Sequence, residues 1–142
     1  MLTVPSFAVN FDGRETLDFT SRARAEHGEG WDWDPGTRTL TLSGLGLYVS
    51  GVKPRVEPGA LILPGGSTIA LSEGSENSIV FDISSCMTDN AYGIYCDGQL
   101  TITGAGRLSV EVTGTNTQNS CGVYAIGDIT IQGGAEVSAS AG

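Results

Sequence analysis

Four aromatic side chains have types and spacing that could bind a sugar. Trp31 and Trp33 stand two residues apart in the segment WDWD, so in a strand both rings share one face and the two aspartates share the other. Tyr95 and Tyr124 occupy the same position of two similar segments and would stack on neighbouring strands. An exposed ring offers a flat apolar face to a sugar ring, whereas a buried ring fills the core. Both interpretations stay open for all four residues.

Acidic side chains form the second candidate group. Asp97 and Asp128 lie in the two similar segments, and Asp89 and Asp82 lie in the adjoining one. Carboxylates on neighbouring strands can share a hard cation through their oxygen atoms. Calcium is therefore a possible metal and the only cofactor expected, and ordinary solvated carboxylates are the alternative.

Catalysis is not expected. A site of the pectin-lyase type needs calcium-binding acids and a base on one face, and a polygalacturonase site needs several aspartates converging at a cleft. Asp97 and Asp128 stand at different positions of the two similar segments, and Arg107 is the only base in the regular part of the chain. We therefore predict a non-catalytic protein.

The composition favours strands and excludes several partners. The chain has 142 residues, about one domain, with 21 glycines and a net charge of -9. This charge repels nucleic acid and anionic lipid, whose phosphates need clustered Lys and Arg. No apolar run approaches the length of a bilayer, so no membrane insertion is expected. The start of the sequence has neither the basic nor the apolar region of a signal peptide.

Three cysteines, an odd number, leave at least one free thiol in a monomer. Their spacing matches no metal site, and His27 is the only histidine. Cys86, Cys96 and Cys121 are interpreted as small buried residues of a β core. A bridge between Cys86 and Cys96 is the alternative.

An internal repeat organises the chain. Residues 90–112 and 119–141 align at an offset of 29 with eight identical residues. Their template, apolar-x-apolar-x-Gly-x3-apolar, extends to two earlier copies that start at Leu40 and Leu61. One unit is too small to bury its own apolar face, so the copies must stack in register as parallel sheets. The side chains predicted to stack inside are Leu42, Leu63, Ile102 and Ile131.

These patterns predict an all-β fold, a right-handed parallel β-helix over residues 39–142, with a β-sandwich as the alternative. Residues 1–38 are predicted to form an N-terminal cap with a hairpin strand and a short helix or turn at 20–30. Residues 72–90 are predicted to be an insertion with one extra strand, marked by the alternation of Ile79, Phe81 and Ile83. No capping segment is recognised after the last repeat of the predicted β-helix. This predicts either a fragment of a longer protein or end-to-end self-association through residues 135–141.

The motifs WDWDPGTRTLTLSGL, GIYCDGQLTITGAGRLSV and GVYAIGDITIQGGAEVSA resemble the β-helix repeat domains of large bacterial surface and secreted proteins, common in gut Firmicutes. The resemblance covers about residues 30–142. Some similar domains are carbohydrate-binding modules that recognise acidic plant polysaccharide with calcium. The resemblance implies an extracellular or bacterial cell-surface module that binds polysaccharide. A structural spacer or adhesin segment is the alternative, and a polysaccharide lyase or hydrolase is a further one.

Overall fold

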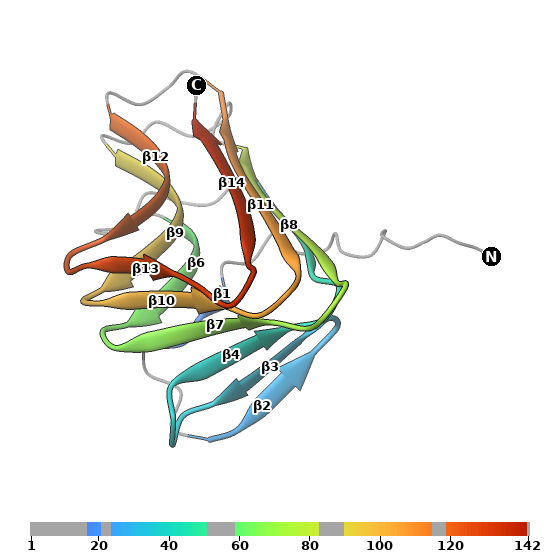
Figure 1. Ribbon diagram of the computed structural model, residues 1–142. Helices are drawn as coiled ribbons and strands as arrows, with labels where there is room; N and C mark the ends of the chain where they lie inside the picture. Colours follow the sequence, from blue (N-terminus) through green and yellow to red (C-terminus); the bar gives the residue numbers. More distant parts are fainter. Residues whose placement is uncertain (1–16, 21–23, 51–58, 83–89, 115–118, 142) are drawn as a thin grey trace.

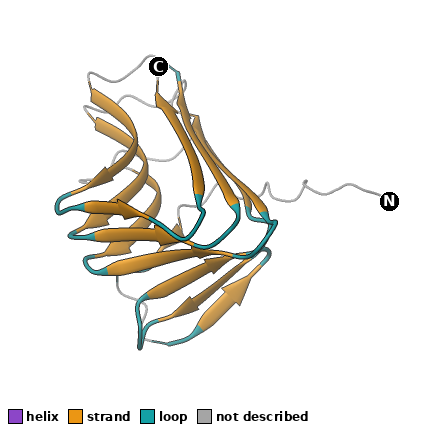
Figure 2. Ribbon diagram, viewed as in Figure 1, coloured by secondary structure: helices purple, strands orange, loops and turns teal. Residues whose placement is uncertain are grey.

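The computed structural model describes residues 17–20, 24–50, 59–82, 90–114 and 119–141, and the structural statements below concern these residues (Figure 1). They are mostly strands joined by tight turns, and none of them is helical (Figure 2). The described residues therefore contain no helix that could span a membrane.

The strands form three sheets, called A, B and C here. Sheet A has four strands in the order β1 (Leu17–Asp18), β6 (Gly59–Pro64), β9 (Asn90–Asp97) and β12 (Asn119–Ala125). Sheet B has six, in the order β13 (Ile129–Ile131), β10 (Leu100–Thr103), β7 (Ser67–Leu71), β4 (Thr39–Leu42), β3 (Trp31–Asp34) and β2 (Glu26–Gly28). Sheet C has four, in the order β14 (Glu136–Ala141), β11 (Arg107–Thr113), β8 (Glu76–Asp82) and β5 (Gly46–Ser50).

The prediction of a single right-handed parallel β-helix is wrong. The strands belong to three separate sheets, and sheet B is mixed because β2, β3 and β4 pair antiparallel while its other pairs are parallel. The sequence misled because alternating apolar residues give every strand the same pattern, whichever sheet the strand joins.

The register corrects the predicted stack of four apolar residues. Sheet B aligns Leu40 with Ile69, Ile69 with Ile102 and Ile102 with Ile131. Leu42 pairs with Leu71 and so lies outside this ladder, and Leu63 lies in sheet A, where its partner is Cys96. The copy that starts at Leu61 therefore does not align with the others, because its template residues straddle the turn from β6 to β7.

The last member of that ladder is also placed differently from the prediction. Ile102 is fully buried between the strands on either side of it, whereas Ile131 on β13 is 50% exposed. Burial in a sheet requires a covering strand, and β13 is the outermost strand of sheet B. An apolar template position therefore does not guarantee a place in the core.

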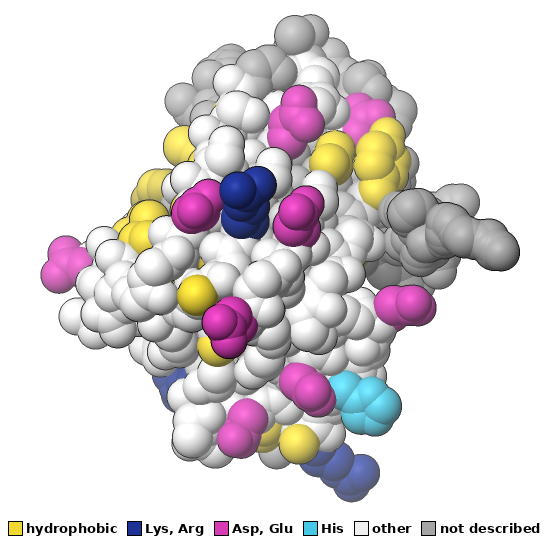
Figure 3. Space-filling model, turned by 45° about the vertical axis from the view of Figure 1, so that its right-hand side comes forward, with side chains coloured by type: hydrophobic (Ala, Val, Ile, Leu, Met, Phe, Trp, Pro, Cys, Tyr) yellow, Lys and Arg dark blue, Asp and Glu magenta, His cyan; other side chains and the backbone are white. Residues whose placement is uncertain are grey.

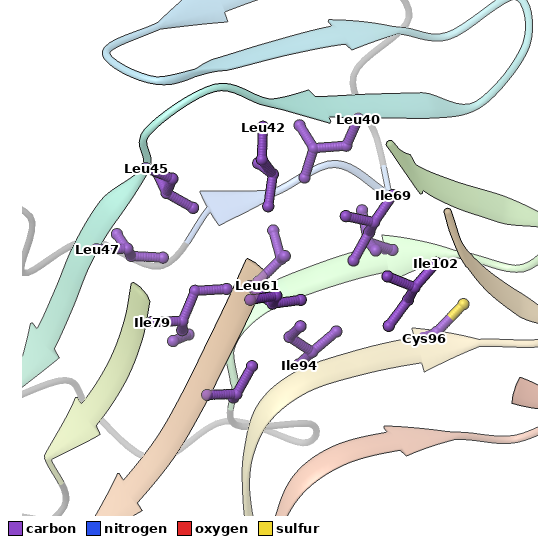
Figure 4. Packing of buried hydrophobic residues seen from close by; sticks show 14 of the residues in the cluster. Leu40, Leu42, Leu45, Leu47, Leu61, Ile69, Ile79, Ile94, Cys96 and Ile102 are labelled. Atoms are coloured by element: carbon purple, nitrogen blue, oxygen red, sulfur yellow. The ribbon is translucent and has the colours of Figure 1, made fainter. Parts of the chain in front are cut away.

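The core lies between the three sheets. Side chains from sheet A (Leu61, Ile94), sheet B (Leu42, Ile102) and sheet C (Ile79) point toward one another (Figure 4). Removing these apolar surfaces from water is the main favourable contribution to folding. The fully buried large side chains are Phe19, Phe81, Leu40, Leu42, Leu61, Leu63, Ile69, Ile79, Ile94, Leu100 and Ile102.

The described part of the N-terminal region contains the predicted hairpin. β3 pairs antiparallel with β4, with Trp31 opposite Leu42, and the Gly36 amide closes the turn by donating to Asp34 Oδ1 at 2.9 Å. Within the segment 20–30, predicted to be a short helix or turn, Glu26–Gly28 form β2, an outer strand, and residues 29–30 are a turn, so its described part is not helical.

The segment interpreted as an insertion is a regular part of the fold. β8 pairs in parallel with β5 on one side and β11 on the other, so it is an inner strand of sheet C. Ile79 and Phe81 alternate into the core as predicted, and Ile83 lies outside the described residues.

Candidate functional site

The two tryptophans lie at the β3 end of the core. Trp33 is 2% exposed, and its ring stacks on buried Phe19 with centroids 4.9 Å apart. Trp31 is half-buried and meets the same ring edge-on at 5.2 Å. This packing gives Trp33 a core role, because no face of its indole is left for a sugar.

The two tyrosines predicted to stack do so, in company with a third. Tyr95 and Tyr124 have parallel-displaced rings with centroids 5.7 Å apart, and Tyr92 lies 4.8 Å from Tyr124 and 5.5 Å from Tyr95. Tyr95 is buried, Tyr92 is half-buried, and Tyr124 is 39% exposed. Only Tyr124 of the three therefore offers much of its ring to solvent.

Tyr92 could not be assigned to this cluster from the sequence, because residues three apart in a regular strand face opposite ways. Here two consecutive residues, Gly93 and Ile94, face the interior: Ile94 is fully buried, and a Cβ on Gly93 would lie 2.2 Å from Cγ1 of buried Val110. The alternation of inward and outward side chains is therefore interrupted at Gly93 and Ile94. As a result, Tyr92 and Tyr95 lie on the same outer face of sheet A.

The predicted metal-binding aspartates lie on different elements of the fold. Asp97 ends β9 in sheet A, Asp128 lies between β12 and β13, and Asp82 ends β8 in sheet C. Asp89 lies outside the described residues. The described residues contain no group of three or more His, Cys, Asp or Glu side chains that could hold a metal ion.

Cys96 is a buried free thiol, so the alternative of a bridge to Cys86 is wrong. Its Sγ lies 3.2 Å from the carbonyl oxygen of Gln99 and 3.4 Å from that of Pro64. Burial raises the pKa of Cys96, because the thiolate would lose its hydration. Cys121 on β12 is also free and is partly exposed.

We expect these two thiols to differ in reactivity. Iodoacetamide at about pH 8 attacks thiolates, so Cys121 should be alkylated in the folded protein while Cys96 stays protected. Peptide mapping by mass spectrometry measures both rates in one sample, and the urea-unfolded chain, in which both thiols react, is the control. Equal labelling of Cys96 and Cys121 in the folded chain would contradict the buried placement of Cys96.

A different site, which the sequence interpretation missed, lies on the outer face of sheet C. The register aligns polar side chains in rows that cross neighbouring strands. The first row consists of Glu76, Arg107 and Glu136, and the second row consists of Ser78, Ser109 and Ser138. All six residues are exposed.

An open groove of about 600 Å³ runs along these two rows. It is lined by the six residues of the rows and by Asn77, Leu108 and Val137, which lie between them in the strands. Asn77 and Leu108 are buried, so their side chains point into the core. The middle of the groove is therefore mainly peptide backbone, and its two rims are polar side chains.

Buried Asn77 holds the strands that form the groove. Its Oδ1 accepts hydrogen bonds from the amides of Gly44 and Leu45, both at 2.8 Å. Its Nδ2 donates to the carbonyl oxygen of Arg107 and to Oγ of Ser75, both at 3.0 Å. A buried amide with all these bonds made fixes the positions of β5, β8 and β11 relative to one another.

The polar groups of the face carry mixed charge. Arg107 Nε lies 3.2 Å from Glu136 Oε1, and both side chains are about two-thirds exposed, so this pair contributes little to stability and remains available to a ligand. Figure 3 shows a basic side chain between acidic ones on this side of the molecule, with hydrophobic side chains nearby.

Tyr48 on β5 adds an aromatic ring to the same face. It is 38% exposed, and its hydroxyl donates a hydrogen bond of 2.7 Å to Asp82 Oδ2. This bond raises the pKa of Tyr48, because it stabilises the protonated phenol beside a carboxylate. The ring is thereby held in one orientation on the sheet.

Part of this face was visible in the repeat. Ser109 and Ser138 are identical at the offset of 29, and Arg107 aligns with Glu136. The contribution of β8 was hidden, because Glu76 and Ser78 fell in the segment interpreted as an insertion.

Comparison with protein-family models, with curated proteins and with solved structures gives no match for this chain. The function therefore has to be argued from the geometry of the site.

Proposed function

We propose that this chain is a non-catalytic module that binds a neutral polysaccharide along the outer face of sheet C. The observation that carries the proposal is the alignment of polar side chains in two rows along an open groove, one row of charged side chains and one of serines. Neighbouring strands lie about 4.8 Å apart, so each row presents hydrogen-bonding groups at a constant interval. Such a surface suits a polymer whose units repeat the same hydroxyl groups.

The side chains provide the interactions that sugar recognition needs. Glu76 and Glu136 can accept hydrogen bonds from sugar hydroxyls, and Arg107 can donate to sugar oxygens. The serine row can do both. The exposed ring of Tyr48 offers an apolar surface on which a sugar ring can stack.

A neutral polymer fits the charge of the face better than an acidic one. Glu76, Glu111, Glu136 and Asp82 lie on this face or at its edge and outnumber Arg107, and the whole chain carries a charge of -9. A polyanion would be repelled. The proposed ligand therefore differs from the acidic polysaccharide that the resemblance implied, whereas the location at the bacterial surface remains part of the proposal.

The rows also argue for binding without catalysis. A glycosidase needs a general acid whose pKa is raised by a shielded site. Glu76 and Glu136 are instead exposed on an open surface. We therefore expect the bound polymer to be held and not cleaved.

The test is a glycan array followed by pull-down with insoluble neutral polysaccharides. We expect the wild-type chain to bind, and Arg107→Ala to weaken binding by about tenfold or more, because hydrogen bonds to charged groups contribute about 1.5–3 kcal/mol. Arg24→Ala, which removes an exposed arginine far from the groove along the chain, is the matched control and should bind like the wild type.

Tyr124→Ala separates the two candidate faces. It removes the exposed ring of the tyrosine cluster on sheet A and should leave binding unchanged. Loss of binding in this variant, with retention in Arg107→Ala, would move the site to sheet A. Absence of binding to any neutral glycan would reject the proposal and favour a structural spacer.

A further inference from the structure

One end of the molecule exposes both backbone edges and apolar side chains. The strands β12, β13 and β14 are the outermost strands of sheets A, B and C, and they lie together at this end (Figure 1). Within the described residues, no strand pairs with their outer edges. Ile129 and Ile131 on β13 are 43% and 50% exposed, and Ile126 in the preceding turn is 59% exposed.

No described strand covers these side chains, whereas their counterparts one strand away are buried. Leu100 and Ile102 on β10 pair with Ile129 and Ile131 and are almost completely buried. An exposed edge strand with apolar side chains is a template for pairing with another chain. Because three such edges lie at the same end of the molecule, we expect a partner that covers all three.

We propose that a second copy of this chain covers this end, with β13 pairing antiparallel to the partner's β13 about a two-fold axis at Thr130. The sequence around this strand, DITIQ at residues 128–132, is nearly symmetric about Thr130. The axis places Ile129 opposite the partner's Ile131, and Asp128 opposite the partner's Gln132. Apolar side chains thus meet apolar side chains, and a carboxylate meets an amide that can donate a hydrogen bond to it.

The other two edge strands and the charges at this end are also consistent with pairing to a second copy. The same axis brings β12 toward the partner's β14, so all three edges are used at once, whereas a single extended peptide would cover only one. The charged residues of the segment 119–141 are Asp128 and Glu136, and Glu136 is engaged by Arg107 of its own chain. No like charges therefore face each other across β13. A segment of this length matches the 20–30 residues or so that each partner contributes to a standard interface.

The first measurement is the oligomeric state of residues 1–142 by sedimentation velocity over a concentration series. We expect a reversible dimer in the micromolar range, and a Kd at least about tenfold weaker for Thr130→Lys, which sets two lysines directly opposite each other. Thr37→Lys, an exposed position in the turn between β3 and β4, changes the net charge equally and should dimerise like the wild type.

The second measurement tests the register. Gln132→Lys should tighten the dimer several-fold, because two new lysine–Asp128 pairs form across the axis, and Gln132→Glu should weaken it by a similar factor. Thr37→Lys and Thr37→Glu control for net charge. A chain that stays monomeric at all concentrations, or Gln132 variants that only reproduce the Thr37 variants, would overturn the proposal.

Discussion

Ile102→Asp is expected to lower the free energy of unfolding by about 4 kcal/mol or more, because it places an unpaired carboxylate in the core. Ile102 is fully buried, with Ile69 on one neighbouring strand and Ile131 on the other. Urea denaturation followed by far-UV circular dichroism measures the loss. Where the variant does not fold, the conservative Ile102→Val, expected to lose about 1 kcal/mol, keeps the position testable.

The matched control is the same substitution one strand further along the same ladder. Ile131 is 50% exposed, so Ile131→Asp keeps its carboxylate in water and should lose less than about 1 kcal/mol. Both variants are compared at a protein concentration where the chain is monomeric, so that self-association does not enter. Near-normal stability of Ile102→Asp, or equal losses in both variants, would contradict the placement of this ladder.

Gly104→Ala is expected to be the second large loss, about 3 kcal/mol or more. Gly104 has a φ of 101°, which side chains rarely adopt, and a Cβ there would lie 2.1 Å from the carbonyl oxygen of Leu71. The contact is with backbone, so relief requires β7 to move away from β10. The same denaturation experiment measures the loss.

Gly44 provides a control that separates strain from steric overlap. It occupies the equivalent turn after β4 with a φ of 111°, but a Cβ there would have no neighbour within 4 Å. Gly44→Ala should therefore lose only the conformational part, roughly 1–2 kcal/mol. A loss in Gly104→Ala no larger than that in Gly44→Ala would show that β7 and β10 are not packed as closely as the structure has them.

Local features of the fold follow from the sequence because they depend on neighbouring residues. The alternation of apolar residues predicts the strands, and the turn residues Asp34 to Thr37 predict the hairpin. The offset of 29 is the true register between the last two strands that the chain adds to each sheet: it pairs Tyr95 with Tyr124 in sheet A, and Leu100 with Ile129 in sheet B. The same offset pairs Leu108 with Val137 in sheet C.

The assignment of strands to sheets was decided only by the tertiary structure. Leu61 and Leu63 have the same pattern as Leu40 and Leu42, yet they lie in sheet A and not in sheet B. The pattern of period two states that one face of a strand is buried, and it carries no information on which strand will cover that face.

The candidate site depended on the tertiary structure for the same reason. Glu76 joins Arg107 and Glu136 in one row because β8 lies beside β11, although 31 and 60 positions separate it from them in the sequence. Exposure likewise depends on the neighbouring side chains and strands. Trp33 is covered by Phe19, whereas Ile131, which is of a residue type usually found in the core, is half exposed. Residue type fixes what a side chain can do, and the covering strand decides whether it faces the core or a ligand.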